Sequence, residues 1–282
     1  MATIVRRRKL GMSSVKGICE KSKKGIQWCR NDKGIPDDEL FIRWGCTSPL
    51  PKKAKVINKS KAIHQVNDKA EFRRALNEAG LCPSTWFHPD DVPNHEIKKG
   101  VIVRKKRHAQ GRDLFYCDTR DDLFKVYQRI GRGYISSHVA KQREYRVFVI
   151  QGRAVAVAKK TPGNPDEIAW NVAKGGRFDS VLWGDWPLKA VKKSIEAFNL
   201  SELDFGGVDV MIDGEGECYI LEINSAPSLT SPYRQTCMAK GLDWMIEHGT
   251  KRIPIINKKG DYKKFIHPAM YDRAIVDYRG EG

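Results

Sequence analysis

The sequence predicts an α+β protein in which antiparallel hairpins are interleaved with helices. Two observations support this class. Apolar residues alternate with a period of two in several short runs after residue 100, and glycine-containing turns separate the runs that can pair. Apolar residues recur at helical spacing in other segments. The chain has 282 residues, 40% of them hydrophobic, enough for about two domains at roughly 150 residues each, with a buried core.

The charge is strongly positive and unevenly distributed. The chain carries 51 Lys and Arg against 34 Asp and Glu, a net charge of +17. Residues 1–110 hold 25 basic and 11 acidic residues, an excess of +14. A field of this sign attracts phosphate-bearing partners, which include both nucleotides and nucleic acids.

Several classes of protein are excluded. There is no apolar run long enough for a transmembrane helix, and no apolar stretch follows the basic start as it would in a signal peptide. We therefore expect no membrane partner. The seven cysteines form no C-x-x-C pair, which predicts reduced thiols and a cytoplasmic protein without a zinc or disulfide framework.

The N-terminal half is predicted to contain a small lobe followed by a helix. Residues 1–60 are basic and rich in Gly, Pro and Lys, which is typical of a small lobe. A helix is then expected after Asp68, because Glu71 three residues later completes a capping box. Gly80 is expected to end it. Its apolar face would consist of Phe72, Leu76 and Ala79.

After residue 100 the spacing of the apolar residues changes to a period of two, which predicts strands. The sequence predicts a strand at 101–103, a hairpin of 145–150 with 153–158, a helix after Pro187, and a hairpin of 207–213 with 217–223. The last hairpin carries the sharpest constellation of polar residues.

Two carboxylates are expected to face each other in that last hairpin. If its turn places Asp213 opposite Cys218, then Asp209 lies directly opposite Glu222. Side chains alternate along a strand, so Asn224 shares the face of Glu222. Carboxylate and amide oxygens suit a hard cation such as Mg²⁺. The alternative is a solvated hairpin face whose acidic residues keep the edge soluble.

A basic loop follows the strand at 101–103. Lys and Arg beside a glycine-containing turn suit a polyphosphate, although the loop lacks the G-x-x-x-x-G-K-S/T pattern of a P-loop. An exposed charged turn or a nucleic-acid patch explains the same composition. The chain also lacks G-x-S-x-G and H-E-x-x-H, the motifs of serine hydrolases and zinc proteases.

Taken together, these segments resemble the ATP-grasp superfamily, and most closely the short ligase-like ATP-grasp proteins often found in phage genomes. The resemblance covers roughly residues 60–232. It is carried, in family order, by NDK at 67–69, VIVRK at 101–105 with the loop to 112, EYRVFV at 144–149 with KK at 159–160, N at 171 with GG at 175–176, and GVDV at 207–210 with LEINSAP at 221–227.

The resemblance implies an ATP-grasp fold, in which two α+β lobes with antiparallel sheets grip ATP. Residues 1–60 would form a short basic N-terminal lobe, 61–232 the ATP-grasp core, and 233–282 a C-terminal helix and tail packing on the core. The implied reaction is ATP-dependent formation of an amide from a carboxylate and an amine, an amino acid being expected. It passes through an acylphosphate and yields ADP and phosphate.

The resemblance also implies roles for individual residues. The Mg²⁺ ligands would be Asp209, Glu222 and Asn224. The catalytic residues facing the γ-phosphate, acylphosphate or acceptor would be Arg146, Lys159 or Lys160, and Asn171. ATP would be bound by Arg104 or Lys105, by the lid residues Gly111 and Arg112, and by the interlobe hinge with Ser137, His138, Val139 and the nearby Lys141.

Two features depart from the family pattern or lie outside it. The lid has a single glycine where relatives have several. Arg43-Trp44-Gly45 resembles an RWG element of the phage-type proteins, to which the resemblance assigns no role.

Two other functions remain as alternatives: a nucleic-acid-binding protein that uses the basic lobe and keeps the core as a scaffold, and a grasp-type kinase. If phage-encoded, the protein would work in the cytoplasm of a host cell.

Overall fold

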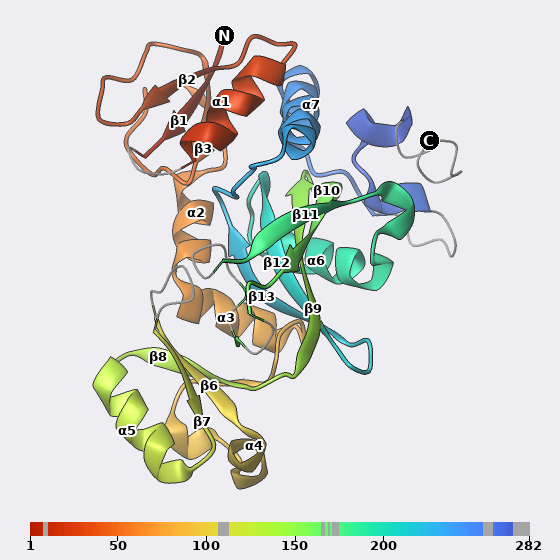
Figure 1. Ribbon diagram of the computed structural model, residues 1–282. Helices are drawn as coiled ribbons and strands as arrows, with labels where there is room; N and C mark the ends of the chain where they lie inside the picture. Colours follow the sequence, from red (N-terminus) through yellow and green to blue (C-terminus); the bar gives the residue numbers. More distant parts are fainter. Residues whose placement is uncertain are drawn as a thin grey trace.

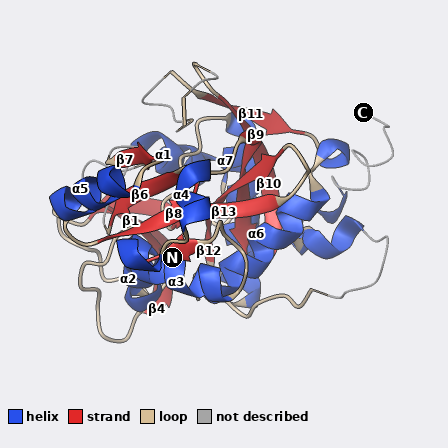
Figure 2. Ribbon diagram, turned by 90° about the horizontal axis from the view of Figure 1, so that it is seen from below, coloured by secondary structure: helices blue, strands red, loops and turns tan. Residues whose placement is uncertain are grey.

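The computed structural model describes residues 1–7, 11–106, 113–164, 167–168, 170, 175–255 and 262–272. Within these residues the strands form three sheets, one parallel and two antiparallel, with helices packed on them (Figure 1; Figure 2). The predicted α+β class is confirmed. No helix in the described part of the chain is both long and apolar enough to cross a membrane.

The N-terminal sheet is parallel, with the order β2-β1-β3-β4. Its strands are β1 (Ala2–Arg6), β2 (Gln27–Arg30), β3 (Leu40–Trp44) and β4 (Lys55–Ile57). Helix α1 (Met12–Lys21) connects β1 to β2 and packs against α7 (Pro232–His248), as Figure 1 shows. The sequence predicted a small lobe here but neither α1 nor the parallel pairing.

A four-stranded antiparallel sheet, with the order β5-β8-β6-β7, lies at the opposite end of the molecule (Figure 1). Its strands are β5 (Thr85–Trp86), β6 (Val101–Lys105), β7 (Leu114–Cys117) and β8 (Gly133–Ser137). Helices α4 (Asn94–Lys99) and α5 (Arg120–Ile130) belong to the same unit. Val101, Val103 and Ile135 share a small core with Leu123 of α5. Because side chains alternate along a strand, Arg104 belongs to the other face of the sheet.

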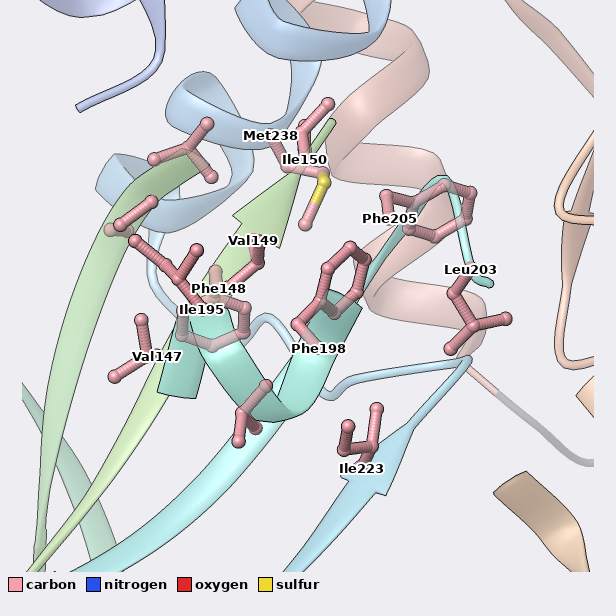
Figure 3. Packing of buried hydrophobic residues seen from close by; sticks show 14 of the residues in the cluster. Val147, Phe148, Val149, Ile150, Ile195, Phe198, Leu203, Phe205, Ile223 and Met238 are labelled. Atoms are coloured by element: carbon pink, nitrogen blue, oxygen red, sulfur yellow. The ribbon is translucent and has the colours of Figure 1, made fainter. Parts of the chain in front are cut away.

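The central sheet has five strands in the order β11-β10-β9-β12-β13, all pairs antiparallel. The strands are β9 (Lys141–Ile150), β10 (Arg153–Thr161), β11 (Arg177–Val181), β12 (Phe205–Asp213) and β13 (Cys218–Asn224), and α6 (Leu188–Leu200) packs on them. Figure 3 shows the core between them, with Phe148 and Phe198 at its centre. Both predicted hairpins and the helix after Pro187 are confirmed.

Two helices lead from the N-terminal sheet to the two antiparallel sheets, α2 (Ser60–Asn67) and α3 (Lys69–Glu78). The predicted cap is confirmed, since the carboxylate of Asp68 accepts a hydrogen bond from the Glu71 amide at 3.3 Å. Arg73 of α3 donates to the carbonyls of Ile220 and Leu221, and its guanidinium lies 5.1 Å from the ring of Tyr134. Helix α3 therefore links the central sheet to the four-stranded one. Short 3₁₀ helices occupy Pro89–Asp91, Trp183–Asp185, Tyr262–Phe265 and Pro268–Met270.

Asn58 ties the N-terminal sheet to the start of β12. Its side chain is fully buried, its φ is +63°, and its amide donates to the Phe205 carbonyl and accepts from the backbone amides of Asp204 and Phe205. We expect Asn58→Ala to lower the free energy of unfolding by about 3 kcal/mol, because buried backbone groups lose their partners and the left-handed backbone is strained. Denaturant titration measures this. Asn58→Gly also loses these hydrogen bonds but does not introduce backbone strain. Its loss of unfolding free energy should therefore be about 1 kcal/mol smaller than that of Asn58→Ala. Wild-type stability in both variants would contradict the assignment.

His267 fastens the C-terminal segment to the β9–β10 turn. The ring is fully buried, with Nε2 3.0 Å from Oε1 of Gln151, and Nδ1 accepts from the Ala269 amide. The amide of Gln151 in turn donates to the carbonyls of Gly249 and Lys251. Burial, with smaller contributions from Arg153 and His248, lowers the pKa of His267 from 6.5 to about 3.

This histidine predicts a pH-dependent stability. Between about pH 6.5 and pH 3 His267 is protonated in the unfolded chain but neutral in the folded protein. The free energy of unfolding therefore falls as the pH drops, by about 1.4 kcal/mol per pH unit in the steepest part of this range. Unfolding titrations across this range measure the slope. His267→Gln should make this slope shallower by the contribution of about one bound proton, which is about 1.4 kcal/mol per pH unit. An unchanged slope in the variant would show that other groups cause it.

Candidate active site

The register of β12 and β13 brings Asp209 and Glu222 together as cross-strand partners, as predicted. The pairing expected at the turn is wrong, because Cys218 pairs with Ile212 instead of Asp213. An irregularity in the ladder beyond Asp209 adds one residue on β13 and shifts the register back. The two carboxylates therefore meet although the turn is one residue tighter than expected.

Asp209 is the centre of a buried ion-pair cluster. It is only 2% exposed and accepts two hydrogen bonds from Arg146 of β9, at 2.6 Å to Nε and 2.8 Å to Nη2. Nζ of Lys160 on β10 lies 2.9 Å from the same carboxylate. Burial alone would raise the pKa of Asp209, but the positive charges of Arg146 and Lys160 outweigh it and hold the pKa below its ordinary value.

Glu144 extends this cluster along β9. Lys160 donates to its Oε1, and Nζ of Lys141 lies 2.6 Å from its Oε2. Burial lowers the pKa of the Lys141 ammonium, and Glu144 only partly offsets this effect. The ammonium also lies 4.6 Å from the ring centre of Trp170. Two lysines thus share one carboxylate on the face of the central sheet that carries Asp209.

Glu222 has its own partners beside the cluster. The side-chain amide of Asn224 donates to its Oε1 at 3.0 Å, so both predicted ligands of β13 lie together. Nζ of Lys69, the first residue of α3, lies 3.6 Å from Oε2 of Glu222 and donates to the Ile223 carbonyl at 3.0 Å. Burial would raise the pKa of Glu222, but Lys69 and the Asn224 amide keep it well below its usual range.

Sequence reasoning missed two residues at this site. Lys69 belongs to the NDK segment that carries the resemblance, so the signal was present although no role was assigned to it. Arg234 near the start of α7 had no sequence signal. It is 2% exposed and donates to the Phe178 carbonyl and the Ser180 hydroxyl of β11. The ring of Phe178 lies 4.7 Å from the guanidinium of Arg146, so Arg234 and Arg146 approach the same residue.

One of the residues predicted for catalysis, Lys159, lies outside the cluster. Lys159 is exposed, and because neighbouring side chains of a strand alternate it faces away from Lys160. Of the two alternatives, the structure therefore brings Lys160 into the cluster and not Lys159. Asn171, Gly111 and Arg112 lie outside the described residues.

The residues predicted to bind ATP lie on or beside the four-stranded sheet. Arg104 and Lys105 end β6, where Nζ of Lys105 is 3.4 Å from Asp113. The segment expected to form the hinge, with Ser137, His138 and Val139, leads from β8 to β9 and so connects the two antiparallel sheets. The Ser137 hydroxyl donates to Glu96 at 2.6 Å, and Gly100 accepts from the His138 amide.

The charges of the site do not balance. Three carboxylates, those of Glu144, Asp209 and Glu222, stand among five buried or nearly buried cations, and the half-exposed Asp179 of β11 adds a fourth carboxylate near one of these cations, Arg234. The cations are Lys69, Lys141, Arg146, Lys160 and Arg234. An excess of buried positive charge is costly unless an anion compensates it. The arrangement therefore fits a polyphosphate ligand.

The donor set also fits Mg²⁺. Asp209, Glu222 and Asn224 supply two carboxylates and an amide on one patch. In the described part of the chain no group of three or more His, Cys, Asp or Glu side chains could hold a metal by itself. Mg²⁺ characteristically binds one or two carboxylates and completes its shell with water and substrate phosphates. These ligands are therefore sufficient only together with a phosphate-bearing substrate.

Known proteins resemble this chain in sequence and in fold. Residues 88–243 match the family model described as the RimK-like ATP-grasp domain. The D-alanine--D-alanine ligase of Fusobacterium nucleatum is 27% identical over 172 residues, which cover 58% of this chain and 57% of the relative. The chain thus matches little more than half the length of this curated relative.

Solved structures with low sequence identity share the fold. A RiPP-associated ATP-grasp ligase of Chryseobacterium gregarium, solved with ADP and a leader and core peptide, has a TM-score of 0.64 at 13% identity, covering 90% of this chain and 99% of that one. An ATP-grasp ligase solved with a minimal precursor, Mg and ADP has a TM-score of 0.61 at 13% identity, covering 89% and 97%. None of these descriptions mentions nucleic acid, so they do not support the alternative of a nucleic-acid partner for the basic lobe.

The family match and the fold thus define an ATP-grasp protein. More particularly, the chain belongs to the RimK-like ATP-grasp family, whose model matches more than half of its residues.

Proposed function

We propose that the protein is an ATP- and Mg²⁺-dependent carboxylate–amine ligase that forms an amide through an acylphosphate. The observation that carries this proposal is the buried cluster at Asp209, in which paired carboxylates lie among an excess of cations. Such a cluster offers ligands for a divalent cation and compensation for phosphate charge in one place. The described residues of the cluster include no cysteine, serine or histidine, and the proposed reaction requires no such covalent nucleophile, since phosphate is transferred directly to the substrate carboxylate.

The residues of the cluster would divide the work as follows. Asp209, Glu222 and Asn224 would hold Mg²⁺, which neutralises phosphate charge when bound. Arg146 and Lys160 would exchange Asp209 for the transferred phosphoryl group and stabilise the charge that develops on it.

The other cations would act on the nucleotide. Lys69 and Arg104 would bind phosphates from α3 and β6, and the backbone of the 137–139 segment would bind the adenine. Closure of the four-stranded sheet over the site would keep water away from the acylphosphate. The acceptor or a phosphate would be oriented by Asn171, and the lid over ATP would include Gly111 and Arg112.

The descriptions of the relatives suggest the class of substrate. One is a D-alanine--D-alanine ligase, and others are solved with precursor peptides. We propose an amino acid or peptide carboxylate as the acid and an amino group as the acceptor. ATP would be converted to ADP and phosphate.

A substrate screen tests this function. The full chain would be incubated with ATP, Mg²⁺ and pooled amino acids and short peptides, while ADP, AMP and phosphate are measured and new amides are sought by mass spectrometry. We expect ADP and phosphate in equal amounts with a new amide. AMP and pyrophosphate would instead show adenylation. A stable phosphorylated product without an amide would show a grasp-type kinase.

A further inference from the structure

The Arg43-Trp44-Gly45 element lies at the end of β3, where the N-terminal sheet meets the central sheet. The indole of Trp44 is fully buried, and its ring stacks on Phe205 with centroids 5.2 Å apart at an interplanar angle of 25°. Phe205 is the first residue of β12, the strand that carries Asp209. One end of the metal-site hairpin is therefore packed against the N-terminal sheet.

Gly45 contacts the other strand at the same open end of the hairpin, where Asn224 pairs with Gly207. A Cβ built on Gly45 would lie 2.8 Å from Cβ of Ala226, closer than real side chains approach one another. Ala226 is the second residue after Asn224, the last residue of β13. The loop that follows the metal ligands thus rests directly on the glycine backbone.

Arg43 holds the backbone that follows this glycine. The residue is 6% exposed, and its guanidinium donates to the carbonyls of Cys46 at 3.1 Å and Ser48 at 2.6 Å. Gly45 itself has a φ of +62°, a conformation that favours glycine. Both its backbone conformation and its contact with Ala226 are therefore fixed by neighbouring groups.

We propose that Gly45 is a positioning residue for the cation site: its contact with Ala226 sets the place of residues 224–226 and so the orientation of the Asn224 amide beside Glu222. This inference rests on the metal site of the proposed function. It gives the RWG element a role, because Trp44 and Gly45 brace the two strands of the hairpin at the ends nearest the ligands. Groups that orient metal ligands without touching the metal alter affinity by about 10- to 100-fold when they are changed.

The test compares two glycines of the same lobe. Gly34 has a φ of +73° and no atom within 4 Å of a built Cβ, so Gly34→Ala introduces backbone strain without a collision. Mn²⁺ would be the probe, its binding to the full chain measured by electron paramagnetic resonance with a non-hydrolysable ATP analogue present. We expect Gly45→Ala to weaken Mn²⁺ binding by about tenfold or more. Gly34→Ala should leave Mn²⁺ binding within about twofold of wild type, because it lies away from the ligands.

A compensating variant separates positioning from a loss of folding. Gly45→Ala combined with Ala226→Gly removes the colliding methyl group and should restore most of the Mn²⁺ affinity. If Gly45→Ala alone fails to fold, Ala226→Gly alone removes the same contact from the other side and should also weaken binding.

The outcomes distinguish this inference from the proposed function. Equal Mn²⁺ binding by Gly45→Ala and Gly34→Ala, or by Ala226→Gly and wild type where Gly45→Ala does not fold, would overturn the positioning role. Equal binding by wild type and Glu222→Gln would overturn the metal site itself, and the inference with it.

Discussion

Glu222→Gln is expected to reduce ADP formation by about 100-fold or more, because under the proposed function it removes a Mg²⁺ ligand together with its negative charge. The fold should persist. Glu222 is 28% exposed at its side chain and its nearest cation, Lys69, also donates to a backbone carbonyl, so that cation keeps a partner. Steady-state turnover with circular dichroism measures both effects.

The control for Glu222→Gln is Glu217→Gln on the same hairpin. Glu217 is exposed and forms a surface ion pair with Lys189 at 2.6 Å. Such pairs contribute about 0–1 kcal/mol, so this variant should keep wild-type activity and stability. Retained turnover in Glu222→Gln would remove this residue from the metal site.

Lys160→Met is expected to lower the free energy of unfolding by about 3–5 kcal/mol, as breaking a buried ion pair typically does. The lysine lies between Glu144 and Asp209, and without it two buried carboxylates share fewer cations. ADP formation should also fall by about 100-fold or more, since under the proposed function Lys160 faces the transferred phosphate. Because uncompensated carboxylates take up protons more readily, the stability difference from wild type should shrink as the pH is lowered.

Lys159→Met is the matched control, one residue away on the exposed face of the same strand. Its effect on stability should stay within about 0.5 kcal/mol, as for most surface substitutions, and its activity should be that of wild type. Denaturant titration and turnover assays of the two variants decide between the lysines. Equal effects of both substitutions would contradict the placement of Lys160 in the cluster.

The hairpins and the pairing of Asp209 with Glu222 could be predicted because local patterns determine them. The alternation of apolar and polar residues, the position of the turn and the face on which each side chain lies can all be read from a single segment. The turn itself was wrong by one residue, since a β-bulge leaves no clear signal in the sequence: the extra residue, Leu221, is apolar like Ile220 before it. The carboxylates met because the bulge compensated for the tighter turn.

The rest of the site depends on contacts between distant segments. Lys69 reaches Glu222 from a helix more than a hundred residues earlier, and Arg234 reaches β11 from α7. The choice between Lys159 and Lys160 needed the register of β10 against β9. The parallel N-terminal sheet was missed because its strands are short and separated by polar segments, so no hydrophobic period distinguishes them.

Transfer of a heavy-oxygen label would show whether ATP phosphorylates a carboxylate, as proposed above. Pooled acids labelled with heavy oxygen in their carboxylates would be incubated with amines, ATP, Mg²⁺ and the full chain, and the released phosphate analysed by mass spectrometry. An acylphosphate route predicts phosphate that carries one heavy oxygen from the acid, alongside unlabelled ADP. Acid-dependent release of unlabelled phosphate, or label in AMP, would contradict the account.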